Sequence, residues 1–348
     1  MRAAVYHGPG KVEIADVPEP DPGPDQVKIA VGANGICGTD LHEYYAGPIF
    51  ITTEPHALTG QQMPLILGHE FSGTITELGA GVTGWSIGDR VAIEPLYRCG
   101  HCGPCRAGNY NVCQSIGFHG LMSDGGMAEY TVVPTDMLHA LPDSVSLDLG
   151  ALVEPMSVAY HAATLGEVRE GDTAMVFGAG PIGIGLWFAL RGKGLDDILV
   201  VEPSATRRAA IEALGARTLD PTSVDVPALV ADETDGRGAD AVYDAAGVAP
   251  AVATALACVG SRKPMVSVAI YEKPLTTPLL DLVMKEARIQ GSLCYTSADY
   301  DAVIALMADG VYDPTGWVSR IAMDAVIDDG FEALHAGTKM KVLVDPSL

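Results

Sequence analysis

The feature that most limits the fold of this chain is the segment GAGPIG at residues 178–183, which fits the pattern G-x-G-x-x-G. It directly follows the apolar run TAMVF and opens a stretch of helical character, IGIGLWFALRGKG. Alone the pattern is weak, but a strand before it and a helix after it are the context that it requires. Glycines there allow a tight turn and a close approach of pyrophosphate to the helix N-terminus. The predicted phosphate-binding turn comprises Gly178, Gly180, Pro181, Ile182 and Gly183.

The alternation of strand and helix continues beyond this turn. The segments DILVVE, DAVYDA, PMVSVAI and ARIQGSL have the composition of buried apolar strands. Between them, SATRRAAIEALGA is amphipathic and places Gly215 at the position of a helix C-cap. Strands that alternate with helices form right-handed βαβ units and a parallel, doubly wound sheet. We therefore predict an α/β nucleotide-binding domain over residues 155–295.

An acidic residue follows the second strand of this predicted domain. Glu202 lies 202 − 183 = 19 residues after Gly183. A carboxylate there can accept hydrogen bonds from the adenosine ribose hydroxyls and repels a 2′-phosphate, which predicts NAD rather than NADP. Arg207 and Arg208 lie close enough to contact the cofactor and to weaken this preference, and the alternative is that they form the solvated face of a helix.

The chain changes character on both sides of this domain. Residues 1–154 are β-rich, with short alternating segments such as QVKIAVGANGI and FSGTITELG between glycine, proline and aspartate turns. After residue 296, ADYDAVIALMADG is typical of a helix and KMKVLVDP of a strand. We predict a β-rich domain over residues 1–154, the nucleotide-binding domain over 155–295, and a return of residues 296–348 to the first domain.

The net charge of the chain limits the molecules that it can bind, and its cysteines indicate the cellular compartment in which it works. The 348 residues include 21 Lys and Arg against 44 Asp and Glu, a net charge of −23 that argues against nucleic acid and anionic lipid as partners. The uncharged run Thr173–Leu190 is interrupted by glycines and a proline, so we expect a strand, a turn and a helix instead of a membrane span. No export signal is recognised, which predicts a cytoplasmic protein whose seven cysteines are reduced.

Four of these cysteines lie close together in the lobe at residues 95–115. The segment CGHCGPCRAGNYNVC has the spacing C-x2-C-x2-C-x7-C. Four thiolates on a short loop suit a closed tetrahedral zinc site, which is structural because no coordination position remains open. An iron–sulfur cluster is the alternative, but ferredoxin-type spacings differ. The predicted ligands of this structural zinc are Cys99, Cys102, Cys105 and Cys113.

A second set of polar residues is scattered along the chain, each in a turn-rich context. Cys37 lies in GICGTDLH, His69 and Glu70 in LGHEFSG, and Glu154 in LVEP. A thiolate, an imidazole and a carboxylate can give zinc three ligands and one open position, which a Lewis-acid catalyst requires. Each residue also has a structural reading: a small buried cysteine, a satisfied histidine–glutamate pair, and an acidic residue capping a helix that begins at Pro155.

Taken together and in order, these motifs resemble the zinc-containing medium-chain alcohol dehydrogenases over essentially the whole chain. The matches are GICGTDLH, GHEFSG, GDRV, the four-cysteine lobe, VEP and GAGPIG. The resemblance implies a GroES-like catalytic domain, a Rossmann domain and an active site between them. It also implies two zinc ions per chain, a nicotinamide cofactor, a small alcohol or ketone substrate, and a homodimer or homotetramer.

Several residue roles are implied by the same resemblance. Cys37 and His69 match the ligands of the catalytic zinc. Glu154 stands where many members have the third ligand, whereas polyol dehydrogenases use the glutamate beside the histidine, here Glu70. We favour Glu154, with Glu70 exchanging with it or supporting it from behind. Thr39 and His42 match the family's proton relay, which runs through the nicotinamide ribose to solvent.

Within the family, the insert between His42 and His69 is similar to that of the 2,3-butanediol (acetoin) dehydrogenases. It contains 26 residues, including the run GPIFI. The resemblance implies interconversion of a vicinal diol and a hydroxyketone, with reduction of diacetyl as a further reaction. The alternatives are a sorbitol- or threonine-type dehydrogenase and a non-catalytic, zinc-stabilised nucleotide-binding protein. Four residues of the insert either line the substrate pocket or form a surface loop or subunit contact: Tyr44, Tyr45, Ile49 and Phe50.

Overall fold

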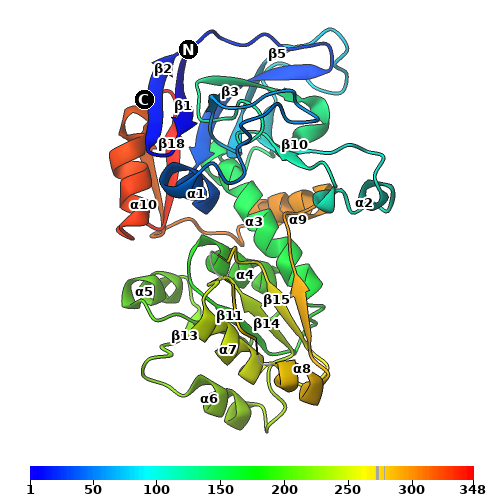
Figure 1. The fold of residues 1–348 in the computed structure, drawn as a ribbon, viewed down its shortest axis with the longest axis vertical. Helices are drawn as coiled ribbons and strands as arrows, with labels where there is room; N and C mark the ends of the chain where they lie inside the picture. The colour runs from blue at the N-terminus through cyan, green and yellow to red at the C-terminus, as the bar shows by residue number, and fades with distance from the viewer. Residues whose placement is uncertain (272–273, 278) are drawn as a thin grey trace. The chain divides into compact units, whose positions relative to one another are not determined.

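The computed structural model describes residues 1–271, 274–277 and 279–348, and the chain divides into two compact units (Figure 1). Unit 1 comprises Met1–Glu154, Thr296–Ala308 and Trp317–Leu348. Unit 2 comprises Pro155–Tyr295 and Asp309–Gly316. The short segment 309–316 therefore belongs with the nucleotide-binding unit, although the sequence analysis grouped it with the first domain.

Unit 2 is built on a six-stranded parallel sheet with the order β13-β12-β11-β14-β15-β16. The strands are β11 (Ala174–Phe177), β12 (Ile198–Val201), β13 (Arg217–Leu219), β14 (Ala241–Asp244), β15 (Pro264–Ser267) and β16 (Arg288–Gly291). The helices between them are α4 (Pro181–Gly192), α5 (Ala205–Ala213), α6 (Val226–Glu233), α7 (Ala249–Cys258) and α8 (Leu279–Lys285). This strand order is that of a doubly wound dinucleotide-binding sheet, which confirms the predicted fold class.

The central strands β11, β12 and β14 are buried along their whole length, as expected for parallel strands covered on both faces. The edges of the sheet differ from expectation. All four residues of β16 are exposed, so the prediction of a buried strand was wrong there, because β16 pairs with β15 alone among the described strands. The sequence analysis also missed β13, whose three residues include an arginine and a threonine in place of an apolar run.

Unit 1 is predominantly β-structure. Its largest sheet has the order β10-β6-β5-β3-β18-β17, with β9 also paired to β3. These strands are β3 (Gln26–Gly35), β5 (Glu70–Leu78), β6 (Arg90–Ile93), β9 (Tyr130–Pro134), β10 (Leu138–Ala140), β17 (Val318–Ala322) and β18 (Lys341–Asp345). Smaller sheets pair β1 (Arg2–Gly8) with β2 (Lys11–Asp16) and β4 (Leu65–Ile66), and β7 (Leu96–Tyr97) with β8 (Gly117–Phe118).

The helical segments of unit 1 are mostly short. They are α1 (Gly38–Ala46), α2 (Gly103–Arg106), α9 (Ser297–Ala308), α10 (Ala333–His335), the π-helix Val326–Glu332, and three 3₁₀ turns, at Tyr110–Val112, Thr135–Met137 and Met323–Ala325. Helix α3 (Leu147–Leu165) begins in unit 1 and continues into unit 2. No helix within the described residues combines the length and apolarity needed to cross a membrane.

The C-terminal part of the chain is joined to unit 1 by sheet pairing and by buried polar contacts. Strand β18 runs antiparallel to β3, with Leu343 opposite Gly35. Helix α9 is held because its Tyr300 hydroxyl donates to the carbonyl of Ile93 at 2.9 Å. The pairing of β18 matters for function because it carries Lys341 to the end of β3.

Candidate active site

In unit 1, Cys37 meets two consecutive residues that lie well beyond it in the sequence, His69 and Glu70. One side-chain atom each from Cys37, His69 and Glu70 lies within 4.8 Å of the other two. The sheet explains the meeting: β3 ends at Gly35 just before Cys37, and Gly35 pairs with Glu70, the first residue of β5. A Cβ at Gly35 would stand 2.1 Å from Glu70 Oε2, so glycine is required for this approach.

The buried carboxylate of Asp40 lies next to Cys37 and His69. Asp40 is fully buried and accepts a hydrogen bond from the backbone N–H of Cys37 at 2.9 Å. Its Oδ1 lies 3.6 Å from Nδ1 of His69, and neither of these two buried atoms has a hydrogen-bond partner in the described structure. A carboxylate behind an imidazole is the usual arrangement that orients a metal-binding histidine. The sulfur, nitrogen and oxygen donors, with this support, fit a zinc ion.

The negative charges around His69 favour the binding of a cation at this site. Burial by itself would lower the pKa of His69, but the charges of Asp40, Cys37 and Glu154 raise the pKa well above its ordinary value. Surroundings that stabilise a proton on the ring also stabilise a metal ion beside it. Because a metal binds the neutral imidazole and the thiolate, protons compete with the metal.

Lys341 is a member of this cluster that the sequence analysis missed. It is 3% exposed, and its ammonium donates to Oε2 of Glu70 and, at 3.0 Å, to the carbonyl of Ile36. Burial acts to lower the pKa of Lys341, but Glu70, Cys37 and Glu154 raise it, so the side chain stays charged. One predicted ligand, Glu70, is therefore engaged in a buried ion pair.

Glu154, the favoured third ligand, is not among the three atoms that lie within 4.8 Å of one another. It is 7% exposed, and its charge acts on both His69 and Lys341, so it lies near the same cluster. The structure thus offers two glutamates for one coordination position, one tied to a lysine and one outside the compact group.

The residues of the predicted relay lie on helix α1, which begins directly after Cys37. The thiol of Cys37 donates to Thr39 Oγ1 across 3.6 Å, so this hydroxyl is adjacent to the sulfur of Cys37, a candidate ligand. His42 is half-buried and follows Thr39 by three residues, a spacing that places both on one face of the helix.

The insert after α1 is anchored by a residue that the sequence analysis did not select. Glu43 is fully buried, and its carboxylate accepts hydrogen bonds from the backbone N–H groups of three consecutive residues at 2.5–3.1 Å. These residues are Ile49, Phe50 and Ile51. The carboxylate therefore fixes the GPIFI run against helix α1.

The aromatic residues of the insert pack within unit 1, with Tyr44 and Phe50 against the same hydrophobic core cluster. The ring of Tyr44 lies 5.0 Å from that of Phe331, and Tyr45 stacks on His335 at 4.1 Å. Both contacts are to the C-terminal helical segment, which favours a structural role for these two tyrosines. Phe50 packs against the hydrophobic core of unit 1, whereas Ile49 is 52% exposed.

The four cysteines of the lobe form the second compact group of candidate ligands. Their sulfurs all lie within 4.8 Å of one another, and none of the chain's seven cysteines forms a disulfide. Backbone N–H groups of Gln114 and Cys105 lower the pKa of the Cys102 thiol to about 6, which favours the thiolate that a metal requires. The remaining thiols, Cys258 and Cys294, are buried at 2% and 8% exposure.

The glycine turn of unit 2 has the conformation that its sequence predicts. Gly178 has φ +101°, and a Cβ on Gly183 would stand 1.9 Å from the carbonyl oxygen of Gly178. Gly180 caps helix α4, whose first residue is Pro181. Backbone N–H groups at the start of this helix can therefore face an anion.

Glu202 touches the turn itself, which the sequence analysis did not foresee. It is 4% exposed, and its two carboxylate oxygens accept the N–H groups of Ala179 and Ser204, each at 2.8 Å. Arg208 donates to the carbonyl of Glu202 at 2.7 Å and pairs with Asp220 at 3.0 Å, so its guanidinium group is already bound to groups of this chain. Arg207 is exposed on the same helix.

Comparison with known proteins agrees with both units. The family model for an alcohol dehydrogenase GroES-like domain matches residues 23–143, and that for a zinc-binding dehydrogenase matches residues 181–309. The (R,R)-butanediol dehydrogenase of Bacillus subtilis is 39% identical over the full length of both chains. A crystal structure of the 2R,3R-butanediol dehydrogenase of that organism superposes with a TM-score of 0.93, covering 99% of each chain.

Two further similar proteins bear on substrate and cofactor. A protein of Saccharomyces cerevisiae named as an (R)-acetoin-forming diacetyl reductase is 35% identical, over 99% of this chain and 87% of that protein. A zinc-binding dehydrogenase of Sinorhizobium meliloti, solved with NADP bound, is 30% identical with a TM-score of 0.90, covering 99% of each chain. The chain belongs to the zinc-binding alcohol dehydrogenases, oxidoreductases that combine a GroES-like domain with a Rossmann-type domain.

Proposed function

We propose that this protein interconverts 2,3-butanediol and acetoin, with reduction of diacetyl as a further reaction, using NAD and a catalytic zinc ion. The observation that carries the proposal is the meeting of Cys37, His69 and Glu70 within 4.8 Å, beside the hydroxyl of Thr39. The similarity to butanediol dehydrogenases and the diacetyl reductase supports the substrate class.

We assign each of these residues of unit 1 a role in the proposed reaction. Cys37, His69 and one glutamate hold the zinc, which supplies a Lewis acid for an alcohol or carbonyl oxygen. Asp40 orients the ring of His69. The hydroxyl of Thr39 would accept the alcohol proton while it releases its own, and His42 would deliver a proton to solvent.

The second metal and the cofactor are part of the same proposal. The four cysteines hold a structural zinc, giving two zinc ions per chain. The glycine turn of unit 2 holds the pyrophosphate of NAD, whose nicotinamide supplies hydride transfer. The buried carboxylate of Glu202 disfavours a 2′-phosphate. The ion pair of Arg208 with Asp220 disfavours it too, because this arginine is then not available to bind the phosphate. A lower KM for NADP than for NAD would overturn the cofactor assignment.

A substrate panel tests the proposed function directly. NADH formation is measured with each stereoisomer of 2,3-butanediol, with sorbitol and with threonine. The proposal predicts the highest kcat/KM for a butanediol isomer. Preference for sorbitol or threonine would assign the chain to another branch of the family, and no turnover with any alcohol would favour a non-catalytic nucleotide-binding protein.

We also propose that the protein is a cytoplasmic homodimer or homotetramer. In support, strand β16 is exposed along its whole length and has an unpaired edge in the described structure. The neighbouring helix α8 exposes large apolar side chains to between 66% and 76%, namely Leu279, Leu280, Val283 and Met284. Apolar surface of this kind marks an association face. Light scattering that gave the mass of one chain at micromolar concentration would contradict it.

The two glutamates can be separated by matched substitutions. We expect Glu154→Gln to lower the zinc content towards one ion per chain and to reduce kcat/KM about 100-fold or more, because a lost ligand weakens the metal. We expect Glu70→Gln to keep two zinc ions, because its carboxylate is paired with Lys341. The reverse pattern in metal analysis would assign the third ligand to Glu70.

The relay makes a prediction about pH. His42→Ala is expected to slow alcohol oxidation by about 10²- to 10⁴-fold, the usual contribution of a positioned acid or base. The pH dependence of kcat/KM should also change, because the group that delivers the proton is gone. An unchanged pH profile in His42→Ala would remove His42 from the relay.

A further inference from the structure

A buried carboxylate joins two loops at the carboxyl end of the parallel sheet in unit 2. Asp244 is the last residue of β14 and is fully buried. Its Oδ1 accepts the N–H groups of Ala246 and Gly247 at 3.0 and 3.1 Å. Its backbone carbonyl accepts the N–H groups of Val268 and Ala269 at 3.0 and 3.1 Å. One residue therefore fixes the loop after β14 and the loop after β15.

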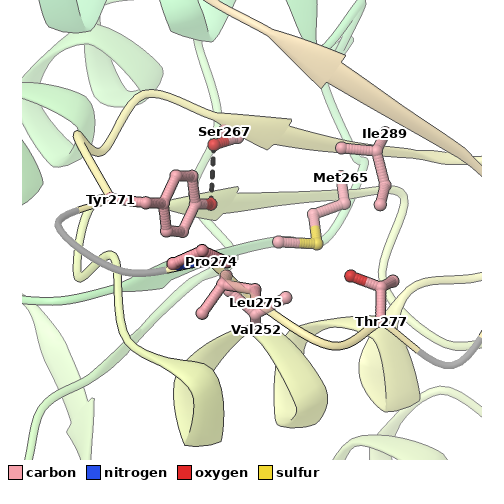
Figure 2. A pocket seen from close by; sticks show the side chains of 8 residues that line it. All are labelled: Val252, Met265, Ser267, Tyr271, Pro274, Leu275, Thr277 and Ile289. Atoms are coloured by element: carbon pink, nitrogen blue, oxygen red, sulfur yellow. Dashed lines mark hydrogen bonds between the residues drawn. The ribbon is translucent and has the colours of Figure 1, made fainter.

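The second carboxylate oxygen is bound by a tyrosine of the second loop, four residues after the end of β15. The hydroxyl of Tyr271 donates to Asp244 Oδ2 at 2.6 Å. Figure 2 shows this hydroxyl directed towards Ser267, 2.7 Å from its Oγ. A phenol has one proton, and here it goes to the carboxylate, so Ser267 donates to the tyrosine oxygen. The order of donation is fixed from Ser267 through Tyr271 to Asp244.

This chain of hydrogen bonds borders a cavity of about 470 Å³ in unit 2 (Figure 2). Its other walls are mostly apolar, with Val252, Met265, Pro274, Leu275 and Ile289, and include the polar side chain of Thr277. Burial, and then the hydrogen bond to Asp244, raise the pKa of Tyr271 to about 12. The phenol therefore remains a donor at any pH at which the enzyme works.

The loop after β14 reaches the glycine turn. A Cβ on Gly178 would stand 3.2 Å from the carbonyl carbon of Ala245. Gly247 lies equally close to the second loop, where a Cβ would meet Ala269 Cβ at 3.1 Å. In a doubly wound sheet the dinucleotide binds at the carboxyl ends of the strands, where both loops lie. A shift of either loop would therefore displace the glycine turn, which is the turn expected to contact the pyrophosphate.

We infer that the bond from Tyr271 to Asp244 holds these two loops in the shape that binds the dinucleotide, so that Tyr271 is a positioning residue for the cofactor. The inference rests on the proposed function, because it needs NAD at the glycine turn. Removing the hydroxyl leaves Asp244 Oδ2 buried without this donor, and the second loop is then held to Asp244 by the main-chain hydrogen bonds of Val268 and Ala269 alone among the described residues. The metal residues belong to unit 1 and are untouched.

The test compares Tyr271→Phe with a matched control, Tyr312→Phe. Tyr312 lies in the same unit at 5% exposure, but its buried hydroxyl has no hydrogen-bond partner in the described structure. The Kd for NADH is measured by titration with the full-length, zinc-loaded protein, together with KM for NAD, KM for butanediol and zinc content. Thermal melting of each variant reports the stability effect separately.

Tyr271→Phe is expected to raise the Kd for NADH and the KM for NAD about tenfold, as expected for a lost hydrogen bond to a charged group. KM for butanediol and zinc content should not change, and Tyr312→Phe should bind NADH as the wild type does. Unchanged NADH affinity in Tyr271→Phe, with only a lower melting temperature, would overturn the inference alone. A wild-type protein that did not bind NADH would overturn the proposed function with it.

Discussion

Replacing His69 with alanine is expected to abolish turnover while the protein stays folded. The ring lies in the compact group with Cys37 and Glu70 and is oriented by Asp40, so its loss removes a ligand and leaves a cavity beside the others. A catalytic zinc ion contributes several kcal/mol of transition-state stabilisation, which corresponds to a loss of about 10³-fold or more in kcat/KM. Metal analysis should give one zinc per chain, the ion held by the four cysteines.

A surface histidine provides the control for this substitution. His7 is 41% exposed and lies 3.6 Å from Glu13, so His7→Ala should retain both zinc ions and the wild-type kcat/KM. Circular dichroism and melting curves show whether each variant is folded. Two zinc ions and normal turnover in a folded His69→Ala protein would show that His69 is not a ligand.

The second large effect is expected in the cysteine lobe, and it concerns stability. Cys102→Ser should lose the structural zinc, because four sulfurs within 4.8 Å of one another are needed to enclose the ion. A ligand present at a thousand times its Kd stabilises the folded state by about 4 kcal/mol, so a loss of this order is expected on unfolding in denaturant.

The matched control is another buried cysteine. Cys258→Ala removes a thiol that is 2% exposed and packs in the apolar core of unit 2. It should retain both zinc ions and lose only the packing of one sulfur atom. If Cys102→Ser and Cys258→Ala had equal stability and equal zinc content, the lobe would not be a metal site.

Features that depend on a short stretch of sequence could be predicted. The glycine turn, each single apolar strand at the centre of the unit 2 sheet and the cluster of four cysteines are formed by short continuous segments, so local spacing determines their geometry. The edge strands of the sheet in unit 2 were harder to predict from the sequence. Strand β13 is short and polar, and β16, which was predicted as a buried strand, has Ile289 as its one large apolar residue and lies at the edge of the sheet.

The supporting residues of the site could not be predicted in the same way. Lys341 meets Glu70 only because β18 pairs with β3, after a separation of 271 residues. Glu202 was selected as a ribose ligand, whereas its contact with the N–H of Ala179 depends on how the turn folds back over the sheet. The link from Tyr271 to Asp244 likewise depends on the neighbouring positions of β14 and β15. Such partners are set by tertiary packing and leave no local pattern.

Removal and return of zinc tests the central claim most directly. The wild-type protein is dialysed against a chelator until metal analysis gives one zinc per chain, and oxidation of each 2,3-butanediol stereoisomer by NAD is then measured before and after zinc is restored. The account predicts that the protein with one zinc is folded and inactive, and that turnover returns in proportion to the second zinc bound. Undiminished butanediol oxidation by protein that lacks the second ion would contradict it.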